Sequence, residues 1–305
     1  FDEDRWLRET LRGAPPDLSA VGRDLAAWGV TGVTDMGPAN DPAFAAWLAA
    51  SGVPQRLVIA GRAELGDGPA NGWSLGPVKL HLHENAMPGW DDSLALLARA
   101  RAQGRGLAVH CTTEVELVWT LALLEAAGSA PGDRIEHASL ADAVQVAQMA
   151  ALGLTVVVQP HFIRERGDQY RTDIPAAQHG DLYRLESLRR AGIVLAGGSD
   201  APFGSADPWA AMQAATDRRT QSGSVIGAEE ALDPEAALAL FLADPLCLGR
   251  QRSLVPGARA DLVLLDRTWS EARADLSAVR PLATWIGGEI FHHGIDQTDA
   301  ERSLR

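Results

Sequence analysis

Residues 106–138 read GLAVHCTTEVELVWTLALLEAAGSAPGDRIEHA, and the order of their patterns sets the architecture. A short apolar run at 106–111 comes first, a Leu- and Ala-rich segment at 114–127 follows, and a second short run occupies 134–138. These lengths predict a strand, a helix and a strand, and Gly128 stands where a helix C-cap is expected. A crossover helix joins parallel strands, so the stretch predicts a βαβ unit.

The same alternation extends in both directions along the chain. Five further strand patterns occur at 31–36, 55–60, 78–84, 155–159 and 193–197. Helical patterns separate the strands and occur at 16–28, 41–51, 93–103, 140–151 and 181–191. Repeated βα units predict an α/β fold with a parallel sheet.

Seven strands are visible, whereas a closed TIM-type (β/α)8 barrel has eight. We therefore expect a (β/α)8 barrel whose first strand lies before Phe1. An open doubly wound sheet is the alternative, but no Gly-x-Gly-x-x-Gly follows the first strand, which weakens that interpretation.

After residue 244 the pattern changes. A Pro256-Gly257 turn precedes an apolar strand near 260–265, and a Gly287-Gly288 turn interrupts a further strand pattern. No crossover helix separates these strands. We therefore predict a barrel domain at 1–252 and, at 253–305, the C-terminal part of a small β-sandwich domain.

Composition excludes several classes of protein. The 305 residues carry a formal net charge of −13, which disfavours non-specific binding to nucleic acid. No apolar run reaches the ~20 residues of a membrane span, and the first ten residues do not resemble a signal peptide. Only two cysteines occur, far apart, so a cytoplasmic location without a disulfide framework is expected.

Polar residues at strand ends are the candidates for chemistry, because parallel barrels build their sites at the carboxyl ends of strands. These candidates are Lys79, His110, His137, His161 and Asp200. Imidazole and carboxylate groups bind Zn²⁺ and similar ions, and such an ion makes water acidic enough to attack a carbonyl. The set therefore indicates a hydrolytic metal site.

The stretch GPVKLHLHE at 76–84 contains both a His-x-His pair and a lysine. Strand alternation places Lys79, His81 and His83 on one face. The same argument turns Cys111 away from His110, and turns Glu136 away from His137 and toward the helices. Farther on, Arg164 and Arg166 are candidates to meet an anionic group of a substrate.

Several motifs, in this order, resemble the amidohydrolase superfamily of metal-dependent hydrolases. The branch that the chain resembles is amidohydrolase family 3, which includes N-substituted formamide deformylase-like enzymes. The resemblance covers nearly the whole chain and rests on Lys79, AVHC at 108–111, RIEHA at 134–138, GGSDAP at 197–202 and PGARADLV at 256–263.

The resemblance implies roles for these positions. His110 and His137 would ligate one divalent metal, with zinc expected, and Asp200 would bind a second metal or the water and act as general base and then acid. Lys79 falls where many members carry a lysine carboxylated by CO2 that bridges two metals. An unmodified Lys79 would instead pair with a carboxylate or orient the substrate.

One departure from the family pattern concerns a His-x-His pair at the end of the family's first strand. Nothing before residue 34 offers such a pair, which agrees with the count of seven strands. His81 and His83 come one βα unit before AVHC, where the lysine belongs. We therefore expect them, with His161, to contact substrate at the barrel mouth, while His81 is also a candidate substitute ligand.

These observations predict a metal-dependent hydrolase that cleaves a C–N bond outside a peptide chain, in an amide or an N-acyl or N-formyl amine. The expected partners are a small-molecule substrate and a second copy in a homodimer. A metal-free protein or fragment of the same fold, serving as a binding or scaffold module, is the alternative. A serine or cysteine nucleophile is a less favoured alternative, and Cys111 is turned away from His110 on its strand.

Overall fold

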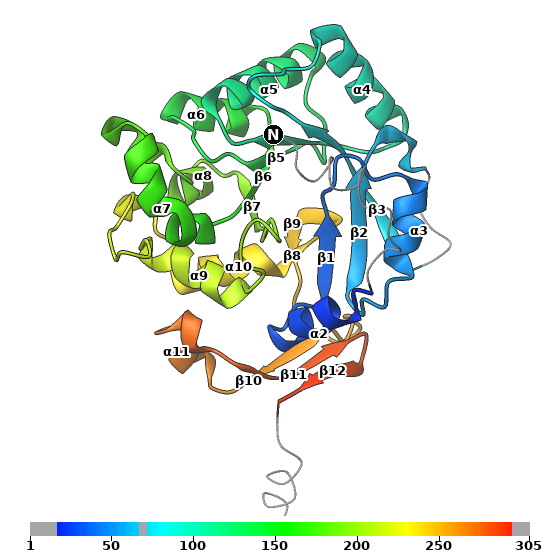
Figure 1. Ribbon diagram of the computed structural model, residues 1–305, viewed down its shortest axis with the longest axis vertical. Coiled ribbons are helices and arrows are strands. Elements are labelled where there is room, and N and C mark those ends of the chain that lie inside the picture. The colour runs from blue at the N-terminus through cyan, green and yellow to red at the C-terminus, as the bar shows by residue number, and fades with distance from the viewer. Residues whose placement is uncertain (1–16, 67–71, 295–305) are drawn as a thin grey trace, which may run out of the picture.

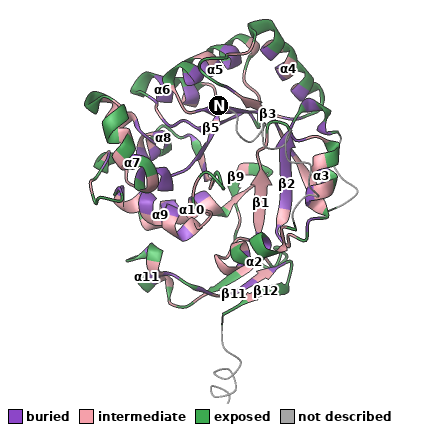
Figure 2. Cartoon of the chain, viewed as in Figure 1, coloured by how far each residue is buried: buried purple, intermediate pink, exposed green. Residues whose placement is uncertain are grey.

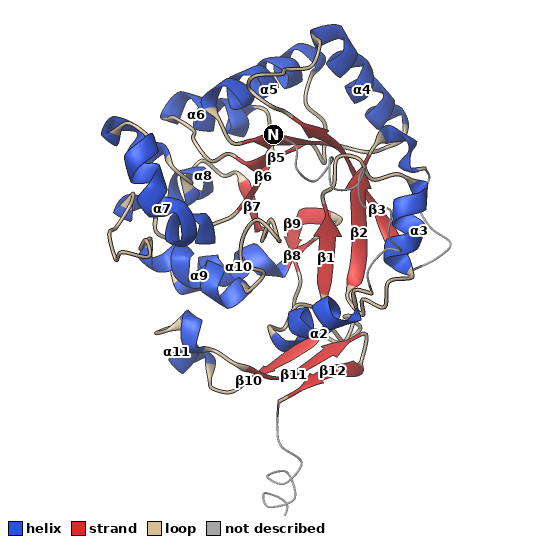
Figure 3. Ribbon diagram, in the orientation of Figure 1, coloured by secondary structure: helices blue, strands red, loops and turns tan. Residues whose placement is uncertain are grey.

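The computed structural model describes residues 17–66 and 72–294. Seven parallel strands form one curved sheet in which each strand pairs with the next along the chain (Figure 1; Figure 3). The strands are β1 (Gly32–Asp35), β2 (Arg56–Gly61), β3 (Trp73–His81), β4 (Leu107–Cys111), β5 (Arg134–His137), β6 (Thr155–Val158) and β7 (Val194–Gly197). The α/β class and the strand count are confirmed.

Helices cover the outer side of this sheet (Figure 3). They are α3 (Pro42–Ala49), α4 (Trp90–Ala102), α5 (Glu114–Ala127), α6 (Ala143–Ala151), α7 (His161–Asp173), α8 (Leu185–Arg190), α9 (Pro208–Asp217) and α10 (Pro234–Leu242). Two further helices, α2 (Ser19–Ala27) and α11 (Trp269–Ala272), lie instead at the end of the molecule that the C-terminal strands form (Figure 3). Sequence patterns missed α7, α9, α10 and the short α11. The expected helix at 16–28 begins at a residue outside the described ranges.

The curvature of the sheet is that of a barrel with one side open. Its edges are β1 and β7, and within the described ranges no strand continues the sheet beyond either edge. A short antiparallel hairpin, β8 (Ala243–Asp244) and β9 (Cys247–Gln251), lies against β7. Among the described residues, the sheet is therefore not closed between β1 and β7.

The chain ends in a three-stranded antiparallel sheet of β10 (Leu262–Leu265), β11 (Pro281–Ile286) and β12 (Glu289–His293). Helix α2 packs on this sheet, and the buried Thr284 hydroxyl donates a hydrogen bond to the Ala26 carbonyl at 2.7 Å. An ion pair of 2.5 Å joins Arg56 of β2 to Asp261. The antiparallel appendage is confirmed, while a domain boundary near residue 253 stays a prediction.

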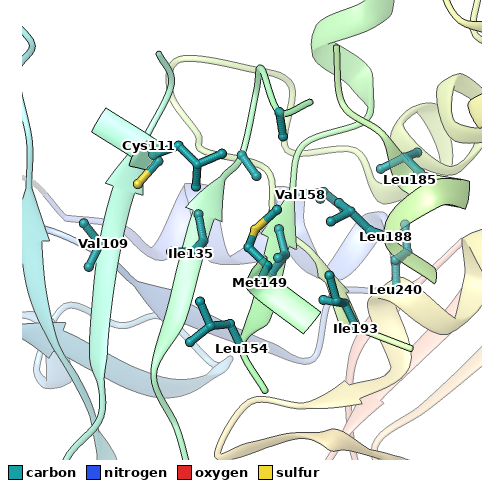
Figure 4. Packing of buried hydrophobic residues seen from close by; sticks show 14 of the residues in the cluster. Val109, Cys111, Ile135, Met149, Leu154, Val158, Leu185, Leu188, Ile193 and Leu240 are labelled. Atoms are coloured by element: carbon teal, nitrogen blue, oxygen red, sulfur yellow. The ribbon is translucent and has the colours of Figure 1, made fainter. Parts of the chain in front are cut away.

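The main core lies between the sheet and its helices (Figure 4). Alternate strand residues such as Val109, Ile135 and Val156 point outward and are fully buried against Leu124 and Met149 of the helices. Burial is concentrated on the strands and on the inner faces of the helices, whereas the outer helix faces are exposed (Figure 2). Apolar burial on this scale provides the dominant stabilisation of such a fold.

The turn between β4 and α5 is held by a capping box. The Thr113 hydroxyl accepts a hydrogen bond from the Glu116 backbone N–H, and the Glu116 carboxylate accepts one from the Thr113 N–H at 3.1 Å. The same carboxylate accepts the Thr112 N–H at 2.7 Å. These bonds satisfy donors at the helix start and fix the chain directly after His110.

In the described part of the chain, no helix combines the length and the apolar character needed to cross a bilayer. Cys111 is buried in the core and Cys247 is exposed, and both are free. The expected outward direction of Cys111 is confirmed, since it packs with the core residues behind β4.

Helix α6 offers a matched test of this core. Val146 is 7% exposed and packs in the core, whereas Val144, two residues earlier, is 65% exposed. We expect Val146→Ala to lower the free energy of unfolding by about 1–3 kcal/mol, because it removes buried methyl groups. Val144→Ala should change it by less than about 0.5 kcal/mol. Urea denaturation measures both, and equal effects would contradict the described packing.

Candidate active site

Six of the seven predicted site residues, all except His161, line one cavity at the carboxyl ends of the parallel strands. Lys79 comes from β3, His110 from β4, His137 from β5, and Asp200 follows β7. The cavity has a volume of about 2720 Å³ and continues into the open side of the sheet between β1 and β7. The sheet thus brings together residues that are up to 121 positions apart, from 79 to 200.

The imidazole rings of four histidines form a continuous row across three strands. His83 and His81 stack with centroids 4.5 Å apart, His81 lies 4.2 Å from His110, and His110 lies 4.5 Å from His137. Parallel register explains the centre of the row, because His81 of β3 is paired with His110 of β4. His81 and His83 therefore lie beside the site, as expected from their shared face with Lys79.

Glu136 does not face the helices, which corrects the prediction from strand alternation. Register pairs Glu136 with His110, so its side chain shares the inner face and lines the cavity, as Arg134 does. His137 then reaches the same cavity because its backbone leaves the regular strand, with φ at +76°. Sequence alternation assumes extended backbone throughout, and His137 breaks that assumption.

Arg134 and Glu136 form a buried ion pair with an N–O distance of 2.6 Å. Burial alone would raise the pKa of the Glu136 carboxyl, but the charges of Arg134 and Lys79 outweigh it and lower that pKa. Glu136 therefore remains ionised beside Lys79. A buried carboxylate needs such partners, since desolvation of an isolated charge costs several kcal/mol.

Lys79 is 8% exposed. Burial lowers the pKa of its ammonium group, while the Glu136 carboxylate acts in the opposite direction. The positive charge of Arg134 adds to the lowering. Lys79 therefore gives up its proton more readily than an exposed lysine does.

Both strand-end histidines are neutral. Burial lowers the pKa of His110 to about 2, helped by the neighbouring His137, and lowers that of His137 to about 4, helped by the charge of Lys79.

The buried Nδ1 of His137 has no hydrogen-bond partner in the described ranges. Neutral imidazole with an unused lone pair is the form that binds metals. Within those ranges, however, no three His, Cys, Asp or Glu side chains converge as a metal site.

Asp200 lies just past β7 in a left-handed backbone conformation, with φ at +51°. Burial raises the pKa of its carboxyl, and the positive charges of Lys79 and Arg166 partly offset that increase. A raised pKa and a position facing the cavity suit a group that takes up and releases a proton.

Helix α7 holds the loop that carries Asp200. His161 Nε2 lies 2.9 Å from the Ser199 carbonyl oxygen, and Arg166 Nη2 donates to the Phe203 carbonyl oxygen at 2.5 Å. Between them, the Glu165 carboxylate accepts the backbone N–H of residue 205 at 3.1 Å. Three side chains on two successive turns of α7 thus fix the loop on both sides of Asp200.

His161 was expected to contact substrate, and the structure gives it a different position. Its side chain is buried behind the loop, at 1% exposure, and does not line the cavity. A Cβ atom at Gly204 would lie 2.4 Å from His161 Nε2, so only glycine fits there. The position of a histidine shortly after a strand does not determine whether its side chain faces the cavity or packs against a neighbouring loop.

Sequence analysis overlooked other residues that line the cavity. Arg134 belongs to the RIEHA motif, and its spacing of two from Glu136 is the signal that places both on one strand face. Phe162 and Tyr170 lie on α7, whose polar sequence hid the helix itself. Helical spacing of aromatic residues along 161–173 was the available signal.

Comparison with known proteins agrees with this architecture. Residues 45–292 match the model of the Amidohydrolase family. The chain is 29% identical over 205 residues to N-substituted formamide deformylase of Arthrobacter pascens, an alignment covering 64% of this chain and 38% of that protein. It is 27% identical over 157 residues to putative amidohydrolase YtcJ of Bacillus subtilis, covering 50% of this chain and 30% of that protein. The chain thus spans well under half the length of these curated relatives.

Solved structures share the fold. An uncharacterised metal-dependent hydrolase from Pyrococcus furiosus superposes with a TM-score of 0.66 at 22% identity, covering 79% of this chain and 57% of that one. A triazine hydrolase variant superposes with a TM-score of 0.65 at 15% identity, covering 98% of this chain and 78% of that one. The family match includes the AVHC, RIEHA and GGSDAP motifs, and the resemblance that they predicted is confirmed. The chain belongs to the amidohydrolase family.

Proposed function

We propose that this protein is a metal-dependent hydrolase that cleaves a C–N bond outside a peptide chain, in an amide or an N-acyl or N-formyl amine. The observation that carries the proposal is the meeting of Lys79, His110, His137 and Asp200 in one cavity at the carboxyl ends of parallel strands. Membership in the amidohydrolase family and similarity to a formamide deformylase support this reaction class.

The residues suit a divalent ion by their chemistry. His110 and His137 would hold it through neutral imidazole nitrogens, and the unpartnered Nδ1 of His137 is a free donor atom. Zn²⁺ or a similar ion supplies Lewis acidity, which polarises a substrate carbonyl and makes water a stronger acid. Asp200 and Lys79 would complete the donor set, Lys79 after carboxylation by CO2.

Carboxylation of Lys79 requires its amine without the proton, and burial favours that form. Arg134, paired with Glu136, would offset the negative charge that carboxylation adds. Without the modification, Lys79 remains a cation next to the Glu136 carboxylate. Labelling with ¹³C-bicarbonate and NMR detection of a carbamate signal distinguishes the two states.

In the proposed reaction, a water oxygen bonds to the carbonyl carbon and the C–N bond breaks, giving a carboxylic acid and an amine. Asp200 takes a proton from the attacking water and passes it to the leaving nitrogen. Its raised pKa brings uptake and release of the proton closer to balance near neutral pH. The bonds from α7 to residues 199, 203 and 205 hold the carboxylate in place during this transfer.

A second candidate function is a metal-free binding or scaffold protein of the same fold. It is favoured by the absence of three converging His, Cys, Asp or Glu side chains within residues 17–66 and 72–294. Metal content and amide hydrolysis separate the two functions. A protein that retains no metal and hydrolyses no amide would support the scaffold.

Replacing Asp200 tests the proton transfer. We expect Asp200→Asn in the full-length protein to lower kcat for N-formyl and N-acyl amines by on the order of 10²- to 10⁴-fold, because the amide cannot accept the proton. Asp173→Asn, at the exposed end of α7, is the matched control and should keep full activity. An active Asp200→Asn protein would rule out the role given to Asp200.

Replacing the histidines tests the metal centre. We expect His110→Asn or His137→Asn to reduce the bound metal measured by elemental analysis, and chelator treatment of the unaltered protein to abolish hydrolysis until Zn²⁺ is restored. His293→Asn, on exposed β12, is the control and should retain the metal. Metal content unchanged in both variants would refute the assignment.

A further inference from the structure

One wall of the cavity is apolar and aromatic. Phe162 and Tyr170 of α7 line it together with Ile174, directly after that helix, and with Leu182 and Tyr183. Tyr170 and Ile174 are partly exposed, and the buried Phe162, Leu182 and Tyr183 lie behind them. These five residues, here called the aromatic wall, pack in a cluster separate from the main core. The Tyr183 ring lies 6.3 Å from the ring of Phe162 and 6.3 Å from that of Tyr170, between centroids.

The aromatic wall lies next to the proposed reaction centre. The Ser139 hydroxyl donates a hydrogen bond of 3.0 Å to the Tyr183 oxygen, and Ser139 is two residues beyond His137. Both Ser139 and His137 line the same cavity. A substrate with its carbonyl at His137 and Asp200 would therefore place its neighbouring group against this wall.

Arg166 stands between the aromatic wall and Asp200. Its guanidinium carbon lies 4.4 Å from the centre of the Phe162 ring, and its Nη2 donates to the Phe203 carbonyl oxygen. Burial raises the pKa of the Asp200 carboxyl and that of the Tyr170 hydroxyl, and the positive charge of Arg166 partly offsets both increases. The guanidinium thus borders both the apolar surface and the proposed general base.

The guanidinium has hydrogen-bonding capacity left for a ligand. It carries five N–H donors, and the described contacts use Nη2 for Phe203 and one ring face for Phe162. Within the described ranges no carboxylate forms an ion pair with Arg166, which is exposed and lines the cavity. An accessible guanidinium of this kind binds carboxylates through paired N–H donors.

We propose that this side of the cavity binds N-acylated amino acids with an aromatic or branched apolar side chain. Arg166 would bind the carboxylate, and the partly exposed Tyr170 and Ile174 of the aromatic wall would contact the side chain, which leaves the amide bond at the reaction centre. The inference rests on the proposed amide hydrolysis and adds the substrate class. It makes Arg166 and Tyr170 the residues that determine specificity.

Three substrates test the two contacts separately. N-formyl-phenylalanine, offered as each enantiomer, carries both groups; N-formyl-phenethylamine lacks only the carboxylate, and N-formylglycine lacks only the ring. We expect one enantiomer of N-formyl-phenylalanine to exceed each partial substrate in kcat/KM by about 10- to 100-fold, the range for a charge-assisted contact or a buried ring. A preference for the uncharged substrate would overturn the proposal.

Variants assign each preference to a residue. Arg166→Gln should remove the advantage of the carboxylate and keep that of the ring, and Tyr170→Ala should do the reverse. Arg171→Gln, on the same helix but bonded to Ser224 at the surface, is the control and should keep both. If Arg166→Gln lowers kcat/KM equally with and without the carboxylate, Arg166 only supports the loop through Phe203 and the proposal fails.

A failure of the hydrolase proposal can be distinguished from a failure of the proposed substrate class. If the full-length protein hydrolyses none of the three compounds, the hydrolase proposal is contradicted, and calorimetry of N-formyl-phenylalanine binding then decides the inference alone. Tighter binding to the unaltered protein than to Arg166→Gln, by about 10-fold or more, supports recognition of the carboxylate. Equal binding overturns it.

Discussion

The parallel hydrogen-bonded register of β3, β4 and β5 is the constraint on which the site depends. It pairs His81 with His110 and His110 with Glu136, so three polar side chains share one inner face of the sheet. Outward residues such as Val109 and Ile135 are locked into the core behind them. A slip of one residue in any strand would exchange these faces, bury histidines among helices and expose the core. The packing of the apolar face thus fixes the positions of the polar side chains on the inner face.

Charged side chains buried inside the curved sheet determine which groups of the cavity are ionised. Arg134, Glu136 and Lys79 are all buried at its floor, where each would be unfavourable without the others. Their mutual presence keeps Glu136 ionised and makes the Lys79 amine easier to deprotonate. The histidines beside them stay neutral for the same reason, since burial and the positive charge of Lys79 both disfavour imidazolium.

Helix α7 serves the site through two groups of side chains. His161, Glu165 and Arg166 hold the loop that carries Asp200, while Phe162 and Tyr170 line the cavity. Arg166 belongs to both groups, because its guanidinium contacts the loop, the Phe162 ring and the open cavity. One helix therefore couples the position of the proposed general base to the surface that we propose recognises the substrate.

Sequence alone was sufficient for the strand order, the outward direction of Cys111 and the grouping of Lys79, His110, His137 and Asp200. These features follow from local periodicity and from the rule that parallel strands end at one edge of the sheet. Only the tertiary structure decided that Glu136 faces inward, because the turn of the backbone at His137 breaks the alternation that sequence reasoning assumes. It likewise decided that His161 lies behind the Asp200 loop and that α7 supplies a wall of the cavity. Those outcomes depend on contacts between segments about 40 residues apart, which no local pattern encodes.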